Sequence, residues 1–476
     1  MNVKASQRDL WFILVLVVAL AARLWHLTTW DLWTDEMHTL ALAQSGVYGS
    51  YSTAPINFLL TGWAIRVFGY GELGGRIVPC VAGLTTVALV YLLGRTWVGK
   101  RAALLGSAVV ALSTWHVYWS QTARHFSLET LAVLLAVHCF LLYWRQGRWI
   151  GVIGAPGFLL IALFIHASAG FYLAALGTFV VGSWLYSVFS TGPVRMWWPR
   201  GKHLVMLIAL AAALAIYLPA YLTVSQLLLQ AAPWNPLWNL LGSLAFYLPP
   251  VLSLAAVAGA AFLAYERNGL AALFLALLVV PIVLLTAASA YTIASSPYCL
   301  PSLPAVALLV GVACDRLLTM GHAAGRAWAT VLLVCVILGA ETADLAFYHT
   351  FNHGFKPRWR EVAAYLRDHR APGELVLSSE ADVLRYYVGA QQQVAWYDHY
   401  ERLIGTPAFP SNSVSGVWYA IYIGEHPFFD ELQRARSHVF ASARLERLFP
   451  LHYGAKDRTI GLFHEPLAAR RMPSVR

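Results

Sequence analysis

The chain has 476 residues, of which 59% are hydrophobic and only 12% charged, and its mean hydropathy is +0.60. Soluble domains carry about 25% charged residues, so the charge of this chain cannot cover a soluble globule of its size, and its hydrophobicity excludes intrinsic disorder. The formal net charge of +10 does not require nucleic acid as a partner, because membrane proteins concentrate Lys and Arg in their cytoplasmic loops. We therefore expect a multi-pass protein whose partners include membrane lipids and no nucleic acid.

The charged residues divide the chain into two regions. Residues 1–347 hold 17 Lys and Arg with 10 Asp and Glu, and residues 348–476 hold the remaining 16 and 13. We therefore predict a transmembrane domain over 1–347 and a soluble domain over 348–476. The five cysteines all lie in or beside apolar runs of the first region, which predicts no disulfide framework and no zinc site.

A membrane helix needs about 20 mostly apolar residues. Such runs occur at 10–28, 75–94, 102–119, 127–144, 149–165, 167–188, 203–222, 241–264, 269–288, 299–318 and 327–347, which predicts about eleven transmembrane helices. A shorter run, 53–69, carries Pro55 and Arg66. It either spans the membrane or lies on its surface as an amphipathic helix.

Positive charge decides between these two readings. With a cytoplasmic N-terminus and a non-spanning 53–69 segment, thirteen Lys and Arg of residues 1–347 lie inside and four outside. The bias reverses if 53–69 spans. The positive-inside rule therefore favours eleven spans, with the first loop (29–74, containing juxtamembrane helices) and the C-terminal domain outside. The first span also resembles a cleaved signal peptide, and either interpretation leaves the first loop outside.

The C-terminal domain shows alternating helix and strand patterns. Residues 357–370 predict an amphipathic helix, and shorter helical patterns lie near 380–388 and 426–438. Strands are predicted at 373–379, 393–398, 417–423 and 458–463. These elements predict a small α/β domain.

The first outside loop carries two adjacent acids, Asp35 and Glu36, followed by His38. They start a helical pattern, where the helix dipole favours a carboxylate, and they either cap a surface helix or act chemically. A metal site from these three residues is disfavoured, because contiguous residues on one helix cannot all face one ion. A transporter pathway would need acids in the middle of spans, where the sequence has none, so we expect an outward-facing site at the membrane surface.

Four sequence segments resemble one family in order and spacing. Trp33-Thr34-Asp35-Glu36, with His38 after it, is similar to the first-loop motif of GT-C glycosyltransferases that use polyprenyl-phosphate sugars, most closely the protein O-mannosyltransferases and the lipid A aminoarabinose transferase. The segments STAPINFLL (52–60), GELGGRIVPCVAG (71–83) and WHVYWSQTARHFSLE (115–129) follow, and they supply Pro55, Glu72, Arg76 and Arg124.

The resemblance continues more sparsely downstream. FIHASAG (164–170) contains His166, and SSPYCLPSLPAV (295–306) contains Tyr298, although Pro297 stands where the family usually has arginine. RWREVAAYL (358–366) resembles the start of the extracytoplasmic domain in bacterial members. The resemblance implies a bacterial plasma-membrane protein of the GT-C type whose site faces outward.

This resemblance implies an inverting sugar transfer from a polyprenyl-phosphate donor to an acceptor hydroxyl of a glycan, lipid or protein. Asp35 is expected to be the general base, with Glu36 orienting it or binding sugar hydroxyls, and Arg124 is expected to hold the donor phosphate. Four other residues are candidates for substrate binding: His38, Glu72, Arg76 and His166, with Tyr298 as a fifth on resemblance alone.

Each of these assignments has a structural alternative. Arg124 can be an interfacial arginine that snorkels, Glu72 and Arg76 a structural i,i+4 pair, and His38 or His166 a packed histidine. We expect no essential cofactor, although a divalent metal is not excluded. The alternative functions are an inactive relative that binds a lipid-linked sugar, and a lipid-linked sugar transporter or flippase. The sequence does not select the sugar, the acceptor or the role of the C-terminal domain.

Overall fold

A computed structural model describes residues 3–47, 54–189, 201–229, 237–290, 295–323, 325, 327–389, 394–396, 414–423, 437, 439–453 and 456–466. The chain forms two compact units. A helical unit contains Met1–Leu27 and Thr39–Ala346, and a C-terminal unit contains Phe347–Arg476 together with Thr28–His38. The segment 28–38, which the sequence assigned to the first loop of the transmembrane domain, thus groups with the C-terminal residues.

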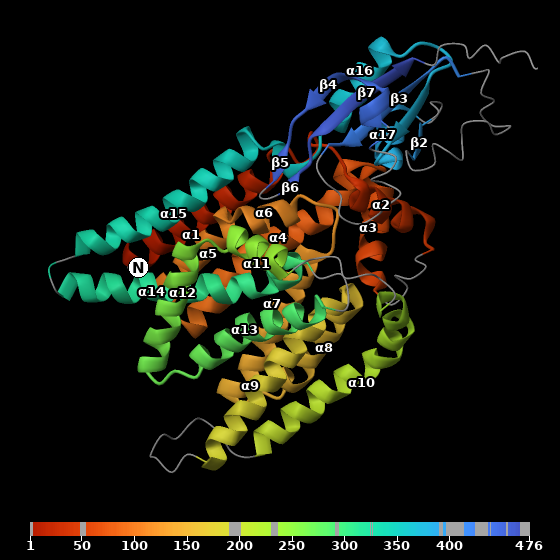
Figure 1. Cartoon of the computed structure of the whole chain (residues 1–476). Helices are drawn as coiled ribbons and strands as arrows, with labels where there is room; N and C mark the ends of the chain where they lie inside the picture. The colour runs from red at the N-terminus through yellow and green to blue at the C-terminus, as the bar shows by residue number, and fades with distance from the viewer. Residues whose placement is uncertain are drawn as a thin grey trace, which may run out of the picture. The chain divides into compact units, whose positions relative to one another are not determined.

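The described residues of the helical unit form helices and their connections (Figure 1). Its N-terminal half contains α1 (Val3–Leu24), the later part of α2 (Thr34–Ser45), α3 (Pro55–Phe68), α4 (Glu72–Trp97), α5 (Lys100–Leu112), α6 (Thr114–Ser120), α7 (Phe126–Gln146) and α8 (Ile150–Ile165). Then follow η2 (Ala167–Ala169), α9 (Gly170–Phe189), α10 (Gly201–Leu229), α11 (Leu237–Tyr247), α12 (Pro250–Tyr265), α13 (Leu270–Ala288), η3 (Ser296–Ser302), α14 (Leu303–Ala323) and α15 (Ala327–Thr350).

Seven helical segments among the described residues are long and apolar enough to cross a membrane. They contain α4, α7, α9, α10, α13, α14 and α15, and the number rises to nine if the bent pairs α5–α6 and α11–α12 are each one span. The remaining two predicted runs correspond to the shorter apolar helices α1 and α8. The short run at 53–69 forms α3 and does not pass this test.

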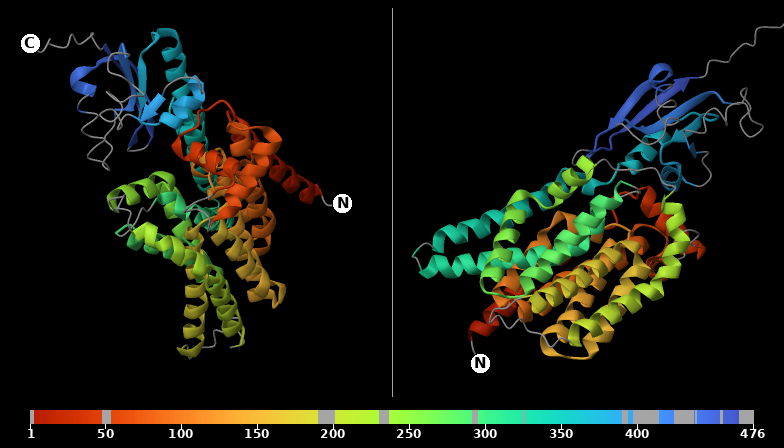
Figure 2. Two further views of the ribbon diagram at one scale, coloured as in Figure 1. Left: turned by 90° about the vertical axis from the view of Figure 1, so that its right-hand side faces the viewer. Right: turned by 60° about the horizontal axis from the view of Figure 1, so that its bottom comes forward.

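The core of the helical unit lies around α14 and α7. In the apolar segment that contains α14, 94% of the residues are buried, and in that of α7 the share is 72%. In α10 and α15 only 22% of the segment's residues are buried. Close packing around α14 depends on glycine, because a Cβ at Gly311 would collide with the Ala102 carbonyl and one at Gly259 with the Leu309 carbonyl. Small residues allow such close helix approach in membranes. The peripheral α10 lies beside α8 and α9 (Figure 2).

A bend between α5 and α6 positions the loop that follows them. The two helices meet at 60°, and the last turn of α5 exposes carbonyls that no longer have helical partners. The buried Arg23 of α1 donates to two of them, Val110 O at 3.2 Å and Ala111 O at 3.2 Å. Its guanidinium also lies 2.8 Å from His116 Nδ1. Arg23 therefore stabilises the bend rather than lying at the membrane surface.

The C-terminal unit contains a mixed five-stranded sheet of order β2-β1-β3-β7-β4. Its elements are η4 (His353–Phe355), α16 (Trp359–His369), β1 (Leu375–Ser378), α17 (Ala381–Val388), β2 (Val394–Trp396), β3 (Gly416–Tyr422), β4 (Arg444–Phe449) and β7 (Ile460–Pro466), with a separate hairpin of β5 (His452–Tyr453) and β6 (Lys456–Asp457). Strands β2, β1 and β3 are parallel, and β7 is antiparallel to β3 and β4. This arrangement confirms the predicted strands at 373–379, 417–423 and 458–463, and the described part of the one at 393–398.

The sequence did not predict β4. Its letters, RLERLF, place Leu445, Leu448 and Phe449 at helical spacing, so periodicity alone favours a helix. Pairing with β7, with a register shift between Leu445 and Arg447, overrides this local preference. The predicted helix near 426–438 lies almost entirely outside the described residues.

Candidate active site

Arg124 lies in the short turn between α6 and α7. Gln121 Nε2 anchors this turn by donating to Arg23 O at 3.0 Å and Trp25 O at 2.7 Å, and Arg124 N donates to Thr122 O at 2.7 Å. The half-buried Arg124 side chain therefore extends from a backbone that is fixed just before α7 begins. A helix N-terminus and a guanidinium both favour an anion.

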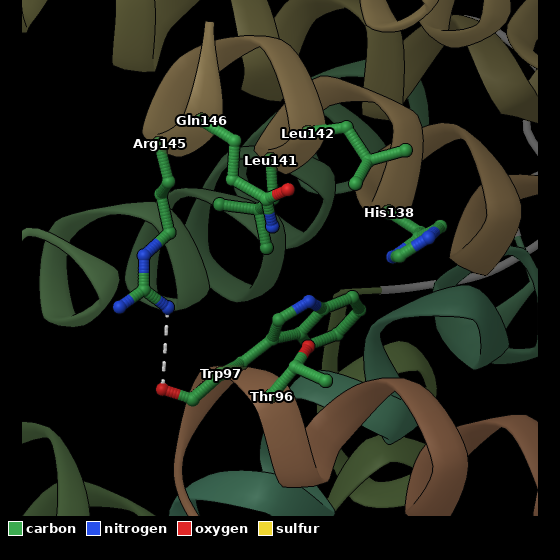
Figure 3. Close-up of a pocket in the computed structure, with 7 residues that line it drawn as sticks. All are labelled: Thr96, Trp97, His138, Leu141, Leu142, Arg145 and Gln146. Carbon is green, nitrogen blue, oxygen red and sulfur yellow. Dashed lines mark hydrogen bonds between the residues drawn. The ribbon is translucent and has the colours of Figure 1, made fainter. Parts of the chain in front are cut away.

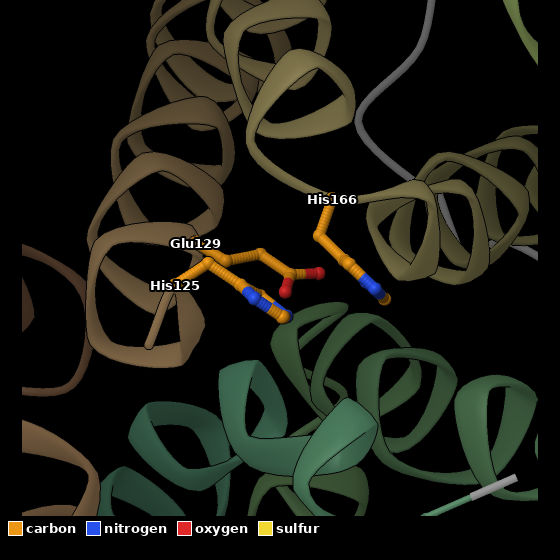
Figure 4. A group of neighbouring side chains, drawn as sticks. All are labelled: His125, Glu129 and His166. Atoms are coloured by element: carbon orange, nitrogen blue, oxygen red, sulfur yellow. The ribbon is translucent and has the colours of Figure 1, made fainter. Parts of the chain in front are cut away.

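His166 lies next to this turn, between α8 and η2. Its ring stacks on His125, with centroids 4.0 Å apart and planes at 11° (Figure 4). Ser168 Oγ donates to Glu129 Oε1 at 2.7 Å and lies 2.7 Å from His166 Nδ1. The fully buried Glu129 is thus linked to His166 through one hydroxyl. Burial and, to a smaller extent, the charge of Arg124 lower the pKa of His166 to about 3, so this ring is neutral at pH 7.

Tyr298 of η3 completes the group. Its ring centroid lies 5.1 Å from that of His166 and 5.9 Å from that of Phe126. Three residues that the sequence selected from separate segments, Arg124, His166 and Tyr298, therefore lie around one point in the helical unit. We call Arg124, His125, Glu129, His166, Ser168 and Tyr298 the arginine–histidine cluster.

The cluster contains a set of metal-ligand side chains. Ligand atoms of His125, Glu129 and His166 lie within 4.8 Å of one another, and a His₂Glu set is one that zinc enzymes use. A histidine binds a metal through a lone pair in the plane of its ring. Two rings stacked almost in parallel do not direct their lone pairs to one point, so one ring would have to turn before the three side chains could share an ion.

The first-loop acids lie in the C-terminal unit, at the start of α2. The prediction that both fall in the first helical turn is confirmed. Asp35 is half-buried and His38 is exposed. Glu36 is fully buried, and its Oε2 lies 3.1 Å from Nζ of Lys356, which is equally buried. The three residues therefore differ in environment, and Asp35 is the less buried of the two acids.

Glu72 and Arg76 lie on the first two turns of α4. Arg76 is fully buried, and its Nη1 donates to Leu27 O at 3.0 Å. Glu72 is half-buried at the first position of the helix. The contact of Arg76 fixes the chain that follows α1, which is a structural role, although its partner is Leu27 O and not the Glu72 of the predicted i,i+4 pair.

A separate cavity of about 280 Å³ lies at the other ends of α4 and α7 (Figure 3). It is lined by Thr96, Trp97, His138, Leu141, Leu142, Arg145 and Gln146. Arg145 Nη1 donates to Trp97 O at 3.3 Å across it. Because α4 and α7 begin near Glu72 and Arg124 respectively, this cavity is distinct from the arginine–histidine cluster.

Comparison with known proteins shows which families and folds this chain is similar to. Residues 52–218 match the family model for dolichyl-phosphate-mannose-protein mannosyltransferases. ArnT from Cupriavidus metallidurans in the apo state superposes with a TM-score of 0.58 at 13% identity, covering 97% of this chain and 98% of ArnT. The archaeal oligosaccharyltransferase AglB from Archaeoglobus fulgidus superposes with a TM-score of 0.56 at 11% identity, covering 88% of this chain and 70% of AglB. A search of curated proteins gives no match.

The chain has the GT-C fold. The resemblance to GT-C transferases of the mannosyltransferase and ArnT kind is thereby confirmed, and the likeness to ArnT extends over the C-terminal unit as well as the helices. Among the described residues, the mostly helical unit with seven to nine candidate spans and the small mixed sheet follow each other in the predicted order.

Sequence reasoning missed four residues of these sites: His125, Glu129, Ser168 and Lys356. His125 and Glu129 flank the recognised Arg124 motif, and an acid at the start of an apolar helix is a signal in itself. Ser168 and Lys356 carry no such signal. Their partners are distant in sequence, 39 residues for Ser168–Glu129 and 320 for Lys356–Glu36.

Proposed function

We propose that this GT-C chain is an inverting glycosyltransferase that moves a sugar from a polyprenyl-phosphate donor to an acceptor hydroxyl on the outer side of the membrane. The observation that carries the proposal is the convergence of Arg124, His166 and Tyr298 in this fold. Among proteins with the same fold, one ArnT structure is bound to undecaprenyl phosphate and one AglB structure to an inhibitory peptide and a dolichol-phosphate. A lipid-linked phosphate is therefore the substrate class that we infer for the cluster.

The proposed topology has eleven spans in a bacterial plasma membrane, with the C-terminal domain outside. It counts the bent pairs α5–α6 and α11–α12 as one span each and includes the shorter α1 and α8. Two arguments support it. Thirteen of the 17 Lys and Arg of residues 1–347 then lie inside, as the positive-inside rule requires. The turn containing Arg124 then lies at the outer surface, where a lipid phosphate is located.

The proposed chemistry needs one base and one cation. Asp35 takes the proton of the acceptor hydroxyl while the acceptor oxygen forms a bond to the anomeric carbon from the face opposite the phosphate. The bond between the anomeric carbon and the phosphate oxygen breaks, and the electron pair leaves with the polyprenyl phosphate. Arg124 stabilises the charge that develops on that phosphate. Direct attack inverts the anomeric configuration.

The other candidate residues have supporting roles in this proposal. His166 and Tyr298 contact the phosphate end of the donor, and the exposed His38 is available to the acceptor or the sugar. Glu72 and Arg76 shape the start of α4. The leaving phosphate is stable without a proton, so a second catalytic acid is not needed, in contrast to glycoside hydrolysis.

We propose that no metal ion is essential. Arg124 supplies the positive charge that the leaving phosphate needs, and the stacked rings of His125 and His166 are not arranged to share an ion. Transfer by enzyme pretreated with EDTA and 1,10-phenanthroline should equal transfer by untreated enzyme within about twofold. Loss of transfer, restored by adding back a single divalent metal, would contradict this proposal.

The test of the function is donor consumption. Purified protein is incubated with synthetic short-chain polyprenyl-phosphate sugars, with and without acceptor hydroxyl compounds, and release of polyprenyl phosphate is followed by mass spectrometry. We expect one donor to be consumed by the parent protein and not by Asp35→Asn, although both bind polyprenyl phosphate. If a folded parent protein binds polyprenyl phosphate but consumes no donor, the chain is an inactive relative or a transporter.

A further inference from the structure

We propose that the C-terminal domain holds the segment that carries the catalytic base, and that Lys356 is a positioning residue for Asp35. The inference rests on the proposed role of Asp35. It assigns a task to a domain whose role the sequence leaves open, and of the two roles expected for Glu36 it favours orientation of the base over binding of sugar hydroxyls.

The segment 28–38 folds with the C-terminal domain. It belongs to the same compact unit as residues 347–476, and side chains from α16, α17 and the connection before α16 contact its backbone and acids. Leu32 N donates to Tyr387 Oη at 2.7 Å. The carboxylate of Asp31 accepts from Arg360 N at 2.8 Å and lies 3.3 Å from Arg360 Nε. These contacts hold the chain directly before α2.

A second contact holds the first turn of α2 itself. Thr34 N donates to Glu380 Oε2 at 3.1 Å, so the carboxylate of the residue just before α17 satisfies an N–H at the start of α2, where the dipole favours negative charge. The other oxygen of Glu380 accepts from Tyr422 Oη of β3 at 2.6 Å. The first turn of α2 is thereby tied to the central sheet through one buried side chain.

The third contact is the ion pair between Glu36 and Lys356, whose burial tolerates the least change in geometry. Both side chains are fully buried, with Nζ and Oε2 3.1 Å apart, and the Lys356 ammonium lies 5.8 Å from the ring centroid of Trp33. A buried pair contributes little net stability, but removal of one partner leaves an unpaired buried charge. Such a pair selects one geometry, and Glu36 immediately follows Asp35 on the same helical turn.

This burial separates the roles of the two acids. A carboxylate with no exposed surface cannot contact a sugar hydroxyl, whereas the half-buried Asp35 can meet an acceptor. A base must lie within hydrogen-bond reach of the proton that it takes, and a shift of about 1 Å can reduce the rate by about 100-fold. The ion pair therefore acts on the rate through the placement of Asp35.

The experiment compares Lys356→Met with two further variants in the full-length protein. Glu36→Gln/Lys356→Met removes both charges, so it leaves no unpaired buried ion and keeps the test valid if the single variant does not fold. Glu361→Gln is the matched control, because Glu361 forms an exposed ion pair with Arg358 at 2.8 Å in the same region. Folding is checked by thermal unfolding in detergent, and donor affinity by binding of polyprenyl phosphate.

We expect the folded Lys356 variant to lose about 10- to 100-fold in kcat, with the KM for both substrates and the affinity for polyprenyl phosphate changed by less than about threefold. The Glu361 variant should match the parent. In an Asp35→Asn background the Lys356 substitution should cause no further loss, because there is no base left to position.

Three outcomes would overturn the inference. One is a raised acceptor KM with unchanged kcat, which would indicate acceptor recognition by the domain. Another is an additive loss in the Asp35→Asn background, and the third is full activity of the charge-free double variant. If Asp35→Asn itself transfers sugar as fast as the parent, the proposed function fails first, and that result is distinct from any result for Lys356.

Discussion

The two candidate regions of this chain are held in place in different ways. The arginine–histidine cluster is fixed by neighbouring helix ends, with Gln121 and Arg23 bracing the turn and Ser168 joining Glu129 to His166. The acidic segment at the start of α2 is fixed by residues that follow it by more than 300 positions, among them Lys356. The proposed phosphate-binding group is therefore built from neighbouring helix ends, whereas the segment with the proposed base is held by residues of the C-terminal unit.

The largest effect is expected for Asp35→Asn. This variant tests whether the segment held by the C-terminal unit carries the general base. The amide has nearly the same shape and size, but it cannot take the proton of the acceptor hydroxyl. We expect donor turnover to fall by about 10²- to 10⁴-fold, with unchanged binding of polyprenyl phosphate. Turnover is measured by release of polyprenyl phosphate.

The matched control for this substitution is Asp368→Asn on the exposed face of α16, which should behave as the parent. A residual rate within about threefold of the parent for Asp35→Asn would remove Asp35 from the mechanism. The way in which the C-terminal unit holds the segment of Asp35 would then have no bearing on sugar transfer.

The next effect is expected for Arg124→Met, which tests the local half. Loss of the guanidinium should reduce turnover by about 10²- to 10³-fold and weaken polyprenyl-phosphate binding. Arg124→Lys should recover part of the loss, because it restores the charge without the planar donor pair. Binding is measured with a fluorescent short-chain polyprenyl phosphate.

Arg148→Met is the control for loss of one positive charge at a different place. Arg148 is exposed just beyond the opposite end of α7. It should leave binding and turnover unchanged. Equal losses in the Arg124 and Arg148 variants would mean that general membrane electrostatics, and not a phosphate site, explain the result.

In both candidate regions the sequence selected the residues that lie in family-like segments: Arg124, His166 and Tyr298 in one, and Asp35 and Glu36 in the other. It missed Ser168 and Lys356, whose partners are distant in sequence. Lys356 could not be predicted, because a single lysine in a charged region carries no pattern and its partner lies 320 residues away. Strand β4 was missed for a similar reason, since pairing with β7 outweighs the helical spacing of its leucines.

A smaller effect is expected for Ser168→Ala within the arginine–histidine cluster. The substitution removes the hydroxyl that joins Glu129 to His166 and leaves Glu129 Oε1 without that donor. Loss of an orienting hydrogen bond of about 1.4 kcal/mol corresponds to a reduction in kcat/KM of about tenfold. Steady-state kinetics with the identified donor measure it.

Ser187→Ala on α9 is the matched control, because the half-buried Ser187 hydroxyl donates to Trp184 O of its own helix. An unchanged rate in the Ser168 variant would show that packing on His125 and the backbone N–H of Ser168, which donates to His166 Nδ1 at 3.2 Å, are enough to hold His166. In that case the hydrogen-bonded link has no part in the local half of the site.

The smallest effect on transfer is expected for Glu374→Gln, which tests whether the C-terminal domain acts through its fold alone. Burial by itself would raise the pKa of Glu374, but hydrogen bonds from Trp418 Nε1 at 2.6 Å, Ala371 N at 2.8 Å and His464 Nε2 at 2.8 Å outweigh it and lower the pKa. An acid with a lowered folded-state pKa contributes stability above its unfolded pKa of about 4.3, and that stability is lost as the pH falls through the folded-state value.

Glu374→Gln should therefore destabilise the C-terminal domain at pH 7 by about 1–3 kcal/mol, and the difference from the parent should shrink as the pH falls below about 4. Amide hydrogen exchange in β3, corrected for the intrinsic pH dependence of exchange, measures the local stability, with Glu361→Gln as the exposed control. Transfer at pH 7 and 25 °C should stay within about twofold of the parent, because the contacts to segment 28–38 come from other residues. A large loss of transfer together with faster exchange would show that Asp35 depends on the overall stability of the domain. The Glu36–Lys356 ion pair would then not be a specific positioning contact.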